Sequence, residues 1–257
     1  MQALTLPARR GSGWLFEGFG VYRKKPWALS LVVSGYWIVM VLISSVPWLG
    51  QIAGPLLIPA FSVSLMNACR LVAQGEPLPP LLLFSGFKNN VRPLLQLGII
   101  YIVFCLCMIG IITVFDDGML YRLLVLGERP SREAMVDNQA VFMIRLVVFF
   151  APLMVAYWFA PVLAAWHDLS AGKALFFSVV ACLRNWRAFL VYIVSIYFFG
   201  ALLLVLVAVL LGTVFASAGE EFAGALMMLI LLVVLPGTYA SFYVSYRDIF
   251  ISIDDDA

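Results

Sequence analysis

The sequence predicts an all-α, polytopic membrane protein with six transmembrane helices in three similar hairpin units, each preceded by a short interfacial helix. The 257-residue chain is 64% hydrophobic and only 12% charged, whereas about a quarter of the residues in soluble proteins are charged. Its mean hydropathy is +1.03. Six apolar segments have the length of about 20 residues that a helix needs to cross a bilayer. The pattern of basic and polar residues that flanks these segments occurs three times.

The six predicted spans are joined by two short outer turns, two inner connections and one long outer loop. In order, they are Pro26–Val46, Gly54–Ala73, Pro93–Phe115, Phe142–Trp166, Ala188–Phe215 and Ala225–Tyr246. Each span must be helical because unpaired backbone groups cannot be left in lipid. The segments are too long for the strands of a β-barrel, which cover about 10 residues.

Positive charge predicts that both termini lie in the cytoplasm, because inner loops collect Lys and Arg. With the N-terminus inside, twelve of the sixteen basic residues fall on the inner side: Arg9, Arg10, Arg23, Lys24, Lys25, Arg70, Lys88, Arg92, Lys173, Arg184, Arg187 and Arg247. The other four lie in the long outer loop. The polar N-terminus lacks the apolar core of a cleavable signal peptide, so the first span is expected to stay as an uncleaved anchor.

The repeat is read from residues at the inner ends of the spans. Lys25, Arg92 and Arg187 occupy matching places before the odd spans, and Arg70, His167 and Arg247 close the even spans. The two steps between the first three residues differ by the length of segment 117–144. We therefore predict one integral membrane domain, 1–257, with units 14–75, 78–172 and 174–250 and an outer insertion at 117–144. The alternative is that apolar segments resemble each other by composition alone.

The stretches before the odd spans are too short to cross the membrane, and their polar residues recur at helical intervals. Ser85, Lys88 and Arg92 form one such row, and Ser178, Cys182 and Asn185 another. This pattern is typical of helices that lie in the headgroup plane. The aromatic residues expected to insert into the membrane are Trp14, Phe19, Phe84, Phe87, Phe176 and Phe177. Alternatively, these stretches pack against the bundle as ordinary inner loops.

Glycines predict two further local features. Gly75 and Gly172 each lie five residues beyond the residue that closes an even span, Arg70 and His167 respectively, where the end of a helix favours a residue with positive φ. The Gly11-Ser12-Gly13 sequence is expected to be part of a flexible tail.

The sequence contains no recognisable catalytic motif, so we predict that the protein is not an enzyme and holds no cofactor or metal. His167 and Asp168 could form an acid–base pair, but the arginines at the matching positions favour a polar residue that ends a span. Neither a metal-binding spacing nor a phosphate-binding loop occurs. The four cysteines are expected to be small buried residues. A net charge of +2 argues against a nucleic-acid partner.

Membrane lipids, mainly anionic ones, are the predicted partners. Lys25, Arg92 and Arg187 lie where basic side chains reach headgroup phosphates, and Arg pairs well with phosphate. The alternative is that these residues are topology signals alone. The favoured function is thus a non-enzymatic membrane factor that binds lipid or partner proteins. The alternative is a transporter of an apolar or amphiphilic solute. The cores of the spans carry no ionisable residue, which argues against ion coupling because ion-coupled transport usually needs buried charge or broken helices.

The repeated basic and polar positions, together with the closing sequence Ser245-Tyr246-Arg247-Asp248-Ile249-Phe250, resemble a family of uncharacterised six-span inner-membrane proteins of proteobacteria. The resemblance covers nearly the whole chain and implies no activity or functional residues. The chain is also distantly similar to membrane domains joined to bacterial glycerophosphodiester phosphodiesterases, although it is expected to have no room for that catalytic domain.

Overall fold

The computed structural model describes residues 3–88, 90–115, 126–127, 144, 147–213 and 219–251, and this part of the chain contains helices but no strands. Five helices are long and apolar enough to cross a membrane: Pro26–Ser44, Gly50–Gln74, Val91–Thr113, Val147–Trp166 and Trp186–Val207. The prediction of a polytopic helical membrane protein is therefore confirmed. The sixth predicted span lies in helix α10 (Gly219–Tyr246) and stays a prediction, and insertion 117–144 lies mostly outside the described residues.

The first, third and fifth spans lie on the outside of the bundle, and the second and fourth lie nearer its centre. Within the most apolar stretch of each outer span, the buried share of residues is 11% in α2 (Pro26–Ser44), 17% in α4 (Val91–Phe115) and 12% in α9 (Trp186–Thr213). The corresponding share is 56% in α3 (Leu49–Gln74) and 39% in Val147–Trp166. The outer spans thus present their apolar side chains to the exterior, as lipid-facing helices do.

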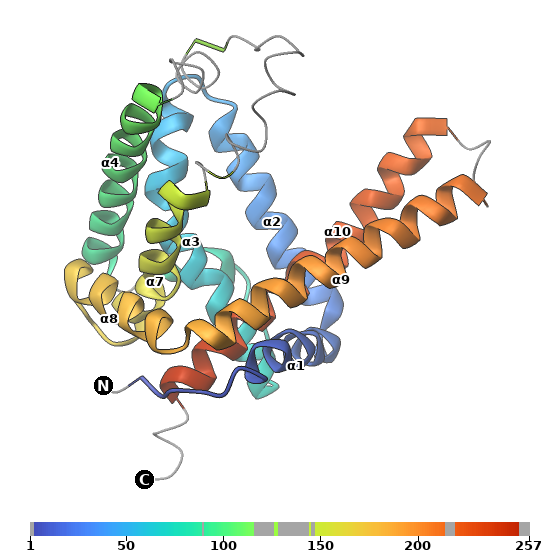
Figure 1. Ribbon diagram of the computed structural model, residues 1–257, viewed down its shortest axis with the longest axis horizontal. Helices are drawn as coiled ribbons and strands as arrows, with labels where there is room; N and C mark the ends of the chain where they lie inside the picture. Colours follow the sequence, from blue (N-terminus) through green and yellow to red (C-terminus); the bar gives the residue numbers. More distant parts are fainter. Residues whose placement is uncertain are drawn as a thin grey trace.

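Three short helices precede the odd spans and lie near the end of the bundle that holds both termini (Figure 1). These are α1 (Arg10–Lys24), η1 (Leu82–Phe87) and α8 (Ala171–Arg184). η1 packs mainly against α3, and α8 against α7 (Ala160–Trp166). α1 packs against α9 and α10. η1 and α8 therefore each pack on the hairpin that precedes them in the chain. No hairpin precedes α1, and it packs on the last hairpin instead.

Glycines allow two of these helices to approach their neighbours closely. A Cβ added to Gly18 of α1 would overlap the backbone of Ser241 in α10. A Cβ added to Gly86 of η1 would overlap the carbonyl oxygen of Ala60 in α3, and the Gly86 N–H donates to Ser64 Oγ at 2.9 Å. The missing side chain is thus what brings helix and hairpin together at both contacts.

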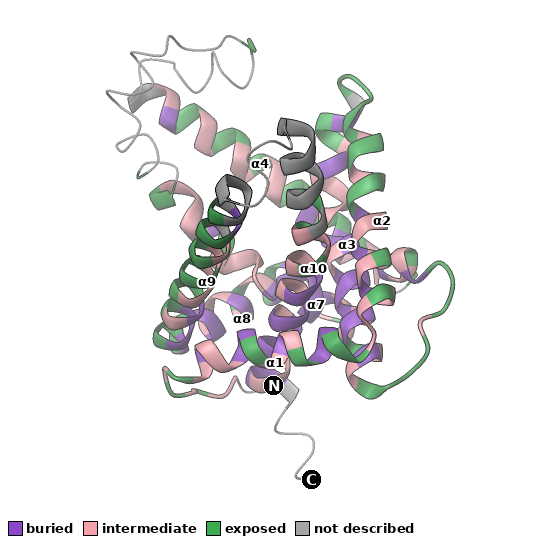
Figure 2. Cartoon of the chain, turned by 90° about the vertical axis from the view of Figure 1, so that its right-hand side faces the viewer, coloured by how far each residue is buried: buried purple, intermediate pink, exposed green. Residues whose placement is uncertain are grey.

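The core gathers where α3, α7 and α10 meet the short helices (Figure 2). Phe159 is fully buried at its centre. Its ring contacts the rings of Phe189, Phe242, Tyr246 and Phe250 at centroid distances of 5.3–5.9 Å. Aromatic pairs of this kind contribute stability beyond the burial of their area, so this end of the bundle is expected to be its most stable part.

Several local expectations for the short helices are wrong. Trp14 is buried against Phe189 and Tyr192 rather than inserted into the membrane. Ser178, Cys182 and Asn185 face the bundle, not the headgroups, because their polar atoms bond to neighbouring segments. The expected flexible tail at 11–13 belongs to α1. By contrast, Phe176 is 62% exposed, as expected for a membrane-facing residue.

The two predicted glycine ends differ. Gly75 has φ +81° and ends α3, with the Glu76 N–H donating to Leu71 O at 2.9 Å, so the Gly75 prediction is confirmed. Gly172 lies inside α8, and Asp168 takes positive φ (+51°) instead. The Gly172 prediction is therefore wrong, because the chain turns directly after His167 and begins α8 earlier than expected.

Candidate functional site

The basic residues before the first span contact the end of α3. Lys24 Nζ donates to Ala73 O at 2.8 Å. Lys25 Nζ donates to Gly75 O at 3.1 Å and to Glu76 O at 2.7 Å. Carbonyls at the end of a helix carry partial negative charge, which attracts cations. Lys25, one of the three predicted lipid contacts, is therefore engaged by the protein itself.

The asparagines before the third and fifth spans also hold segments together. Asn90 has φ +48° and its Nδ2 donates to Ala164 O, in α7, at 2.6 Å. Asn185 is buried; its Nδ2 donates to Leu4 O at 2.8 Å, and its Oδ1 accepts from the Leu6 N–H at 2.8 Å. The Asn-x-Arg sequences thus contain a structural residue that fixes the start of the span.

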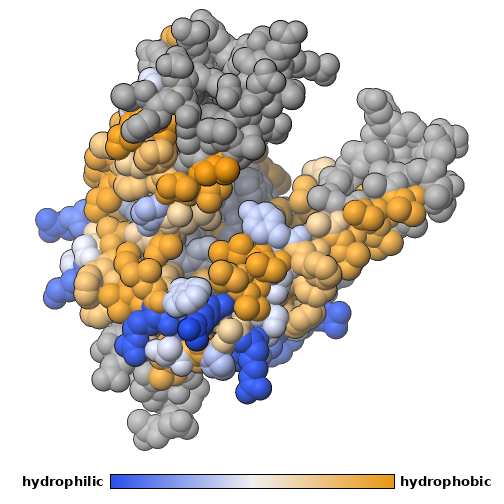
Figure 3. All heavy atoms as spheres, viewed as in Figure 1, coloured by the Kyte–Doolittle hydropathy of each residue, from blue (hydrophilic) through white to orange (hydrophobic). Residues whose placement is uncertain are grey.

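Arg92 and Arg187, two residues after these asparagines, are exposed at the starts of α4 and α9. Within the described part of the chain, neither guanidinium has a hydrogen bond or an ion pair. The Arg187 guanidinium lies 5.3 Å from the centre of the Trp186 ring, and Trp186 is itself 55% exposed. Figure 3 shows hydrophilic side chains gathered around the lower end of the bundle, below the apolar surface. Both arginines can therefore take an external partner.

A cluster of charges joins the two ends of the chain. Arg10 pairs with both Glu17 and Asp248, and Arg247 pairs with Glu17 at 3.1 Å. Trp14 Nε1 also donates to Asp248 Oδ2 at 3.0 Å. The hydrogen bond that Arg10 donates to Glu17 is the main cause that raises the pKa of Arg10 above its ordinary value. Because two cations meet two carboxylates, the cluster is balanced and fastens α1 to the end of α10.

His167 and the other residues that close the even spans meet near the same end. His167 Nε2 lies 2.6 Å from the Tyr246 hydroxyl oxygen. The Arg70 guanidinium lies 5.0 Å from the centre of the Trp166 ring, and Trp166 Nε1 donates to Asn67 Oδ1 at 2.9 Å. Among the described residues, no three His, Cys, Asp or Glu side chains gather as metal ligands would. The arrangement joins α3, α7 and α10 through two hydrogen bonds and a cation–π contact.

A cavity of about 590 Å³ lies between the spans. This volume falls within the range of about 300–1,000 Å³ that is typical of ligand pockets. Its lining comes from α3, α4, α9, α10 and the fourth span and carries no charged side chain: Ser62, Met66, Tyr101, Phe150, Leu153, Met154, Tyr157, Trp158, Tyr192, Ile196, Thr238, Tyr239 and Phe242. The walls are mainly apolar and aromatic, with a few hydroxyl groups. They suit an uncharged, apolar molecule.

The fourth span is interrupted beside this cavity. Residues 147–157 and Ala160–Trp166 are helical, with a turn at 158–159. Ser178 of α8 spans the break: its Oγ accepts from the Phe159 N–H at 3.0 Å and donates to Val155 O at 3.0 Å. Pro161 lacks an N–H and favours the start of a new helix. The hydroxyl thus replaces a helical hydrogen bond and fixes Trp158 at the cavity wall.

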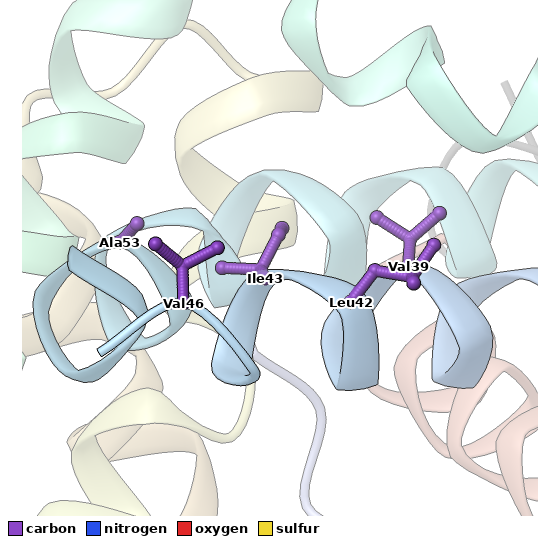
Figure 4. A pocket seen from close by; sticks show the side chains of 5 residues that line it. All are labelled: Val39, Leu42, Ile43, Val46 and Ala53. Carbon is purple, nitrogen blue, oxygen red and sulfur yellow. The ribbon is translucent and has the colours of Figure 1, made fainter. Parts of the chain in front are cut away.

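A smaller cleft of about 310 Å³ lies between α2 and α3 (Figure 4). Its lining is entirely aliphatic and consists of Val39, Leu42, Ile43, Val46 and Ala53. Because these side chains offer no hydrogen-bonding group, the cleft provides apolar contact alone.

Sequence reasoning identified the basic residues but missed the cavity. Its residues are widely spaced in the chain, and their aromatic rings look like ordinary span residues. The signal present in the sequence was the run Tyr157-Trp158-Phe159 followed by Pro161. This run places three aromatic rings beside a residue that interrupts a helix.

The apolar spans and the basic end of the bundle define a polytopic helical membrane protein. Over 257 aligned residues, the chain is 34% identical to a protein of Burkholderia thailandensis described as a probable inner membrane protein, and the alignment covers 97% of this chain and 94% of that protein. The chain belongs to this family of inner membrane proteins. No protein-family model matches the chain, and no solved structure matches it.

Proposed function

We propose that the protein is a non-enzymatic, six-span inner-membrane protein that holds anionic lipid at its cytoplasmic face through Arg92 and Arg187. The observation that carries this proposal is the division of roles within Asn-x-Arg. Asn90 and Asn185 bond to the protein, while the arginine that follows each stays exposed at the start of a span. A long Arg side chain in this position can lie along the helix while its guanidinium reaches the headgroups.

The proposal includes three similar hairpin units and cytoplasmic termini. Support for the units comes from the contacts at the start of each odd span. Lys25 bonds to the end of α3 and Asn90 to the end of α7. Asn185 bonds to Leu4, whose N–H donates to Ile249 O just beyond α10. In each unit, therefore, the start of the first helix is tied to the end of the second. The hydrogen bond between Leu4 and Ile249 joins the two ends of the described chain and so supports termini on one side of the membrane.

The expected binding energy is modest. Each basic residue near an anionic leaflet contributes about 1 kcal/mol, so two arginines contribute about 2 kcal/mol, or roughly 30-fold in affinity. Salt screens exposed contacts of this kind. Lys25 is expected to contribute less than the arginines because its ammonium already bonds to Gly75 and Glu76.

The test is a double substitution, Arg92→Gln with Arg187→Gln. We expect it to reduce the phosphatidylglycerol and cardiolipin that co-purify at low salt, as measured by lipid extraction and mass spectrometry. The matched control is Arg9→Gln with Lys173→Gln, which removes the same charge from exposed positions that do not start a span. Equal lipid content in both double variants would contradict the proposal and leave Arg92 and Arg187 as topology signals.

A second function, transport of an apolar or amphiphilic solute, is favoured by the cavity and by the break at 158–159. A broken helix beside a cavity is a common feature of transporters. Flux of a fluorescent, uncharged monoacylglycerol probe across vesicles containing the protein would support transport, whereas binding without flux would argue against it.

A further inference from the structure

We propose that the cavity between the spans holds an acyl chain of a bilayer lipid, which enters from the hydrocarbon layer beside Met154. This apolar site is separate from the phosphate contacts at Arg92 and Arg187. Three observations carry the assignment: the depth of the cavity along the spans, the exposure of one lining residue on the lipid-facing surface, and the chemistry of the walls.

The cavity lies at the depth of the hydrocarbon layer. Ser62, on its α3 wall, precedes Arg70 by eight residues, which is about 12 Å along a helix. Tyr239, on its α10 wall, precedes Arg247 by the same number of residues. Arginines that close spans lie near the membrane surface, and the hydrocarbon layer is about 30 Å thick. Both wall residues therefore lie near the middle of the bilayer, which acyl chains reach and headgroups do not.

Met154 connects the cavity with the lipid-facing surface. It belongs to the lining and is also 61% exposed. Val147, seven residues earlier and therefore on the same face of the helix, is 67% exposed. Because this exposed face of a span is apolar, it meets acyl chains rather than water. A methionine side chain is unbranched and flexible, so it can move aside and admit a chain.

The walls favour hydrocarbon over water. The Tyr157 hydroxyl donates to Leu97 O at 2.6 Å, and the Tyr192 hydroxyl lies 2.7 Å from Ser241 Oγ. These hydroxyls are already engaged, and most of the other lining side chains are apolar or aromatic. Water filling the 590 Å³ would amount to about 20 molecules at about 30 Å³ each, and the walls offer them few polar partners.

An empty cavity of this size is unfavourable as well. Side chains that line a void lose dispersion contacts, and protein interiors contain few voids larger than a water molecule. An acyl chain restores those contacts. Since lipid tails are as apolar as the walls, the gain comes from packing rather than from transfer out of water. A charged ligand group is excluded because the lining carries no counter-charge.

The experiment uses phosphatidylcholine with a photoactivatable diazirine in the middle of one acyl chain, mixed into phosphatidylcholine vesicles that contain the protein. This lipid has no net charge, which separates the apolar site from attraction of anionic lipid to Arg92 and Arg187. After irradiation, mass spectrometry of peptides identifies the labelled residues. We expect labels on three lining residues: Ser62, Ile196 and Tyr239. Phosphatidylcholine with the diazirine on its headgroup is the depth control and should label none of them.

Two substitutions, Ser62→Phe and Ile196→Trp, fill the cavity with a larger side chain. Each should lower the labelling of Tyr239 to the level given by the headgroup probe, because the chain loses its space. The matched control is Ile193→Trp on the same helix. Ile193 is 43% exposed and lies outside the cavity lining, so this variant should label like the unmodified protein. Thermal unfolding and gel filtration check that each variant is folded.

Labelling of the unmodified protein decides the proposal even if neither filling variant folds. Chain-probe labels on exposed residues such as Ile193, but on none of the three lining residues, would mean that no chain enters and would overturn the proposal. Equal labelling by the headgroup probe would contradict the depth of the site. Unchanged labelling of Tyr239 in a folded filling variant would overturn the cavity as the site. Lipid binding by Arg92 and Arg187 is tested separately, by co-purification of anionic lipid.

Discussion

Asn185→Ala tests how the N-terminal segment is held on the bundle. The Asn185 side chain is 1% exposed and makes three hydrogen bonds, to Leu4 O, the Leu6 N–H and Ala181 O, at 2.8–2.9 Å. A typical net contribution of about 1 kcal/mol for each bond predicts a loss of about 3 kcal/mol. Water reaching the half-buried Leu4 and Leu6 would reduce this toward about 2 kcal/mol.

The assay is unfolding of the purified protein in detergent, combined with hydrogen exchange of the N-terminal peptide. We expect faster exchange at Leu4 and Leu6 in Asn185→Ala, because the segment loses its anchors. The control is Arg187→Ala, two residues away and exposed, where surface substitution should change stability by no more than about 0.5 kcal/mol. Equal stability of the two variants with unchanged exchange would refute the role of Asn185 in holding the N-terminal segment on the bundle.

Two further predictions concern packing and thiol reactivity. Gly86→Ala should destabilise the protein by about 3 kcal/mol or more, since the added Cβ would overlap Ala60 O and overpacking typically costs about 1–3 kcal/mol. The control is Gly110→Ala, where a Cβ meets nothing within 4 Å. Equal unfolding temperatures of the two variants would contradict the close approach of η1 to α3. Burial raises the pKa of Cys182 to about 12 from 9.0, so the folded protein should resist maleimide at pH 8 at this residue, whereas the unfolded protein should react. As pH rises from 9 toward 12, the thiol ionises in the unfolded chain but not in the folded one, which should lower the free energy of unfolding. Rapid labelling of Cys182 in the folded protein at pH 8 would contradict its burial.

Membrane class and helical spans were predictable because they depend on local composition and segment length. Roles that depend on a distant partner were not. Asn185 read as part of a polar stripe facing lipid, but its partners at Leu4 and Leu6 are about 180 residues away in the chain. Trp14 is a residue type typical of interfacial anchors, yet α1 packs on α9 and α10 and buries Trp14 against Phe189.

The candidate site was also predictable only in part. Arg92 and Arg187 stand out in the sequence because each follows an asparagine by two residues and lies next to the start of an apolar span. The cavity does not, because its residues come from five segments and no local pattern distinguishes a ring that faces a cavity from one that faces lipid. The position of Trp158 depends on the break between residues 157 and 160, which Pro161 alone did not specify.

The most direct test of the proposed function is the membrane topology, because lipid binding by Arg92 and Arg187 at the inner face requires both residues to be cytoplasmic. Reporter domains are fused after residues on either side of the predicted spans. Fusions after Leu49, Arg129 and Gly219 should report the outer side, and fusions after Gly75, Lys173 and Asp256 the cytoplasmic side. A cytoplasmic signal at Arg129, or an outer signal at Gly75 or Lys173, would contradict the six-span arrangement and the placement of both arginines.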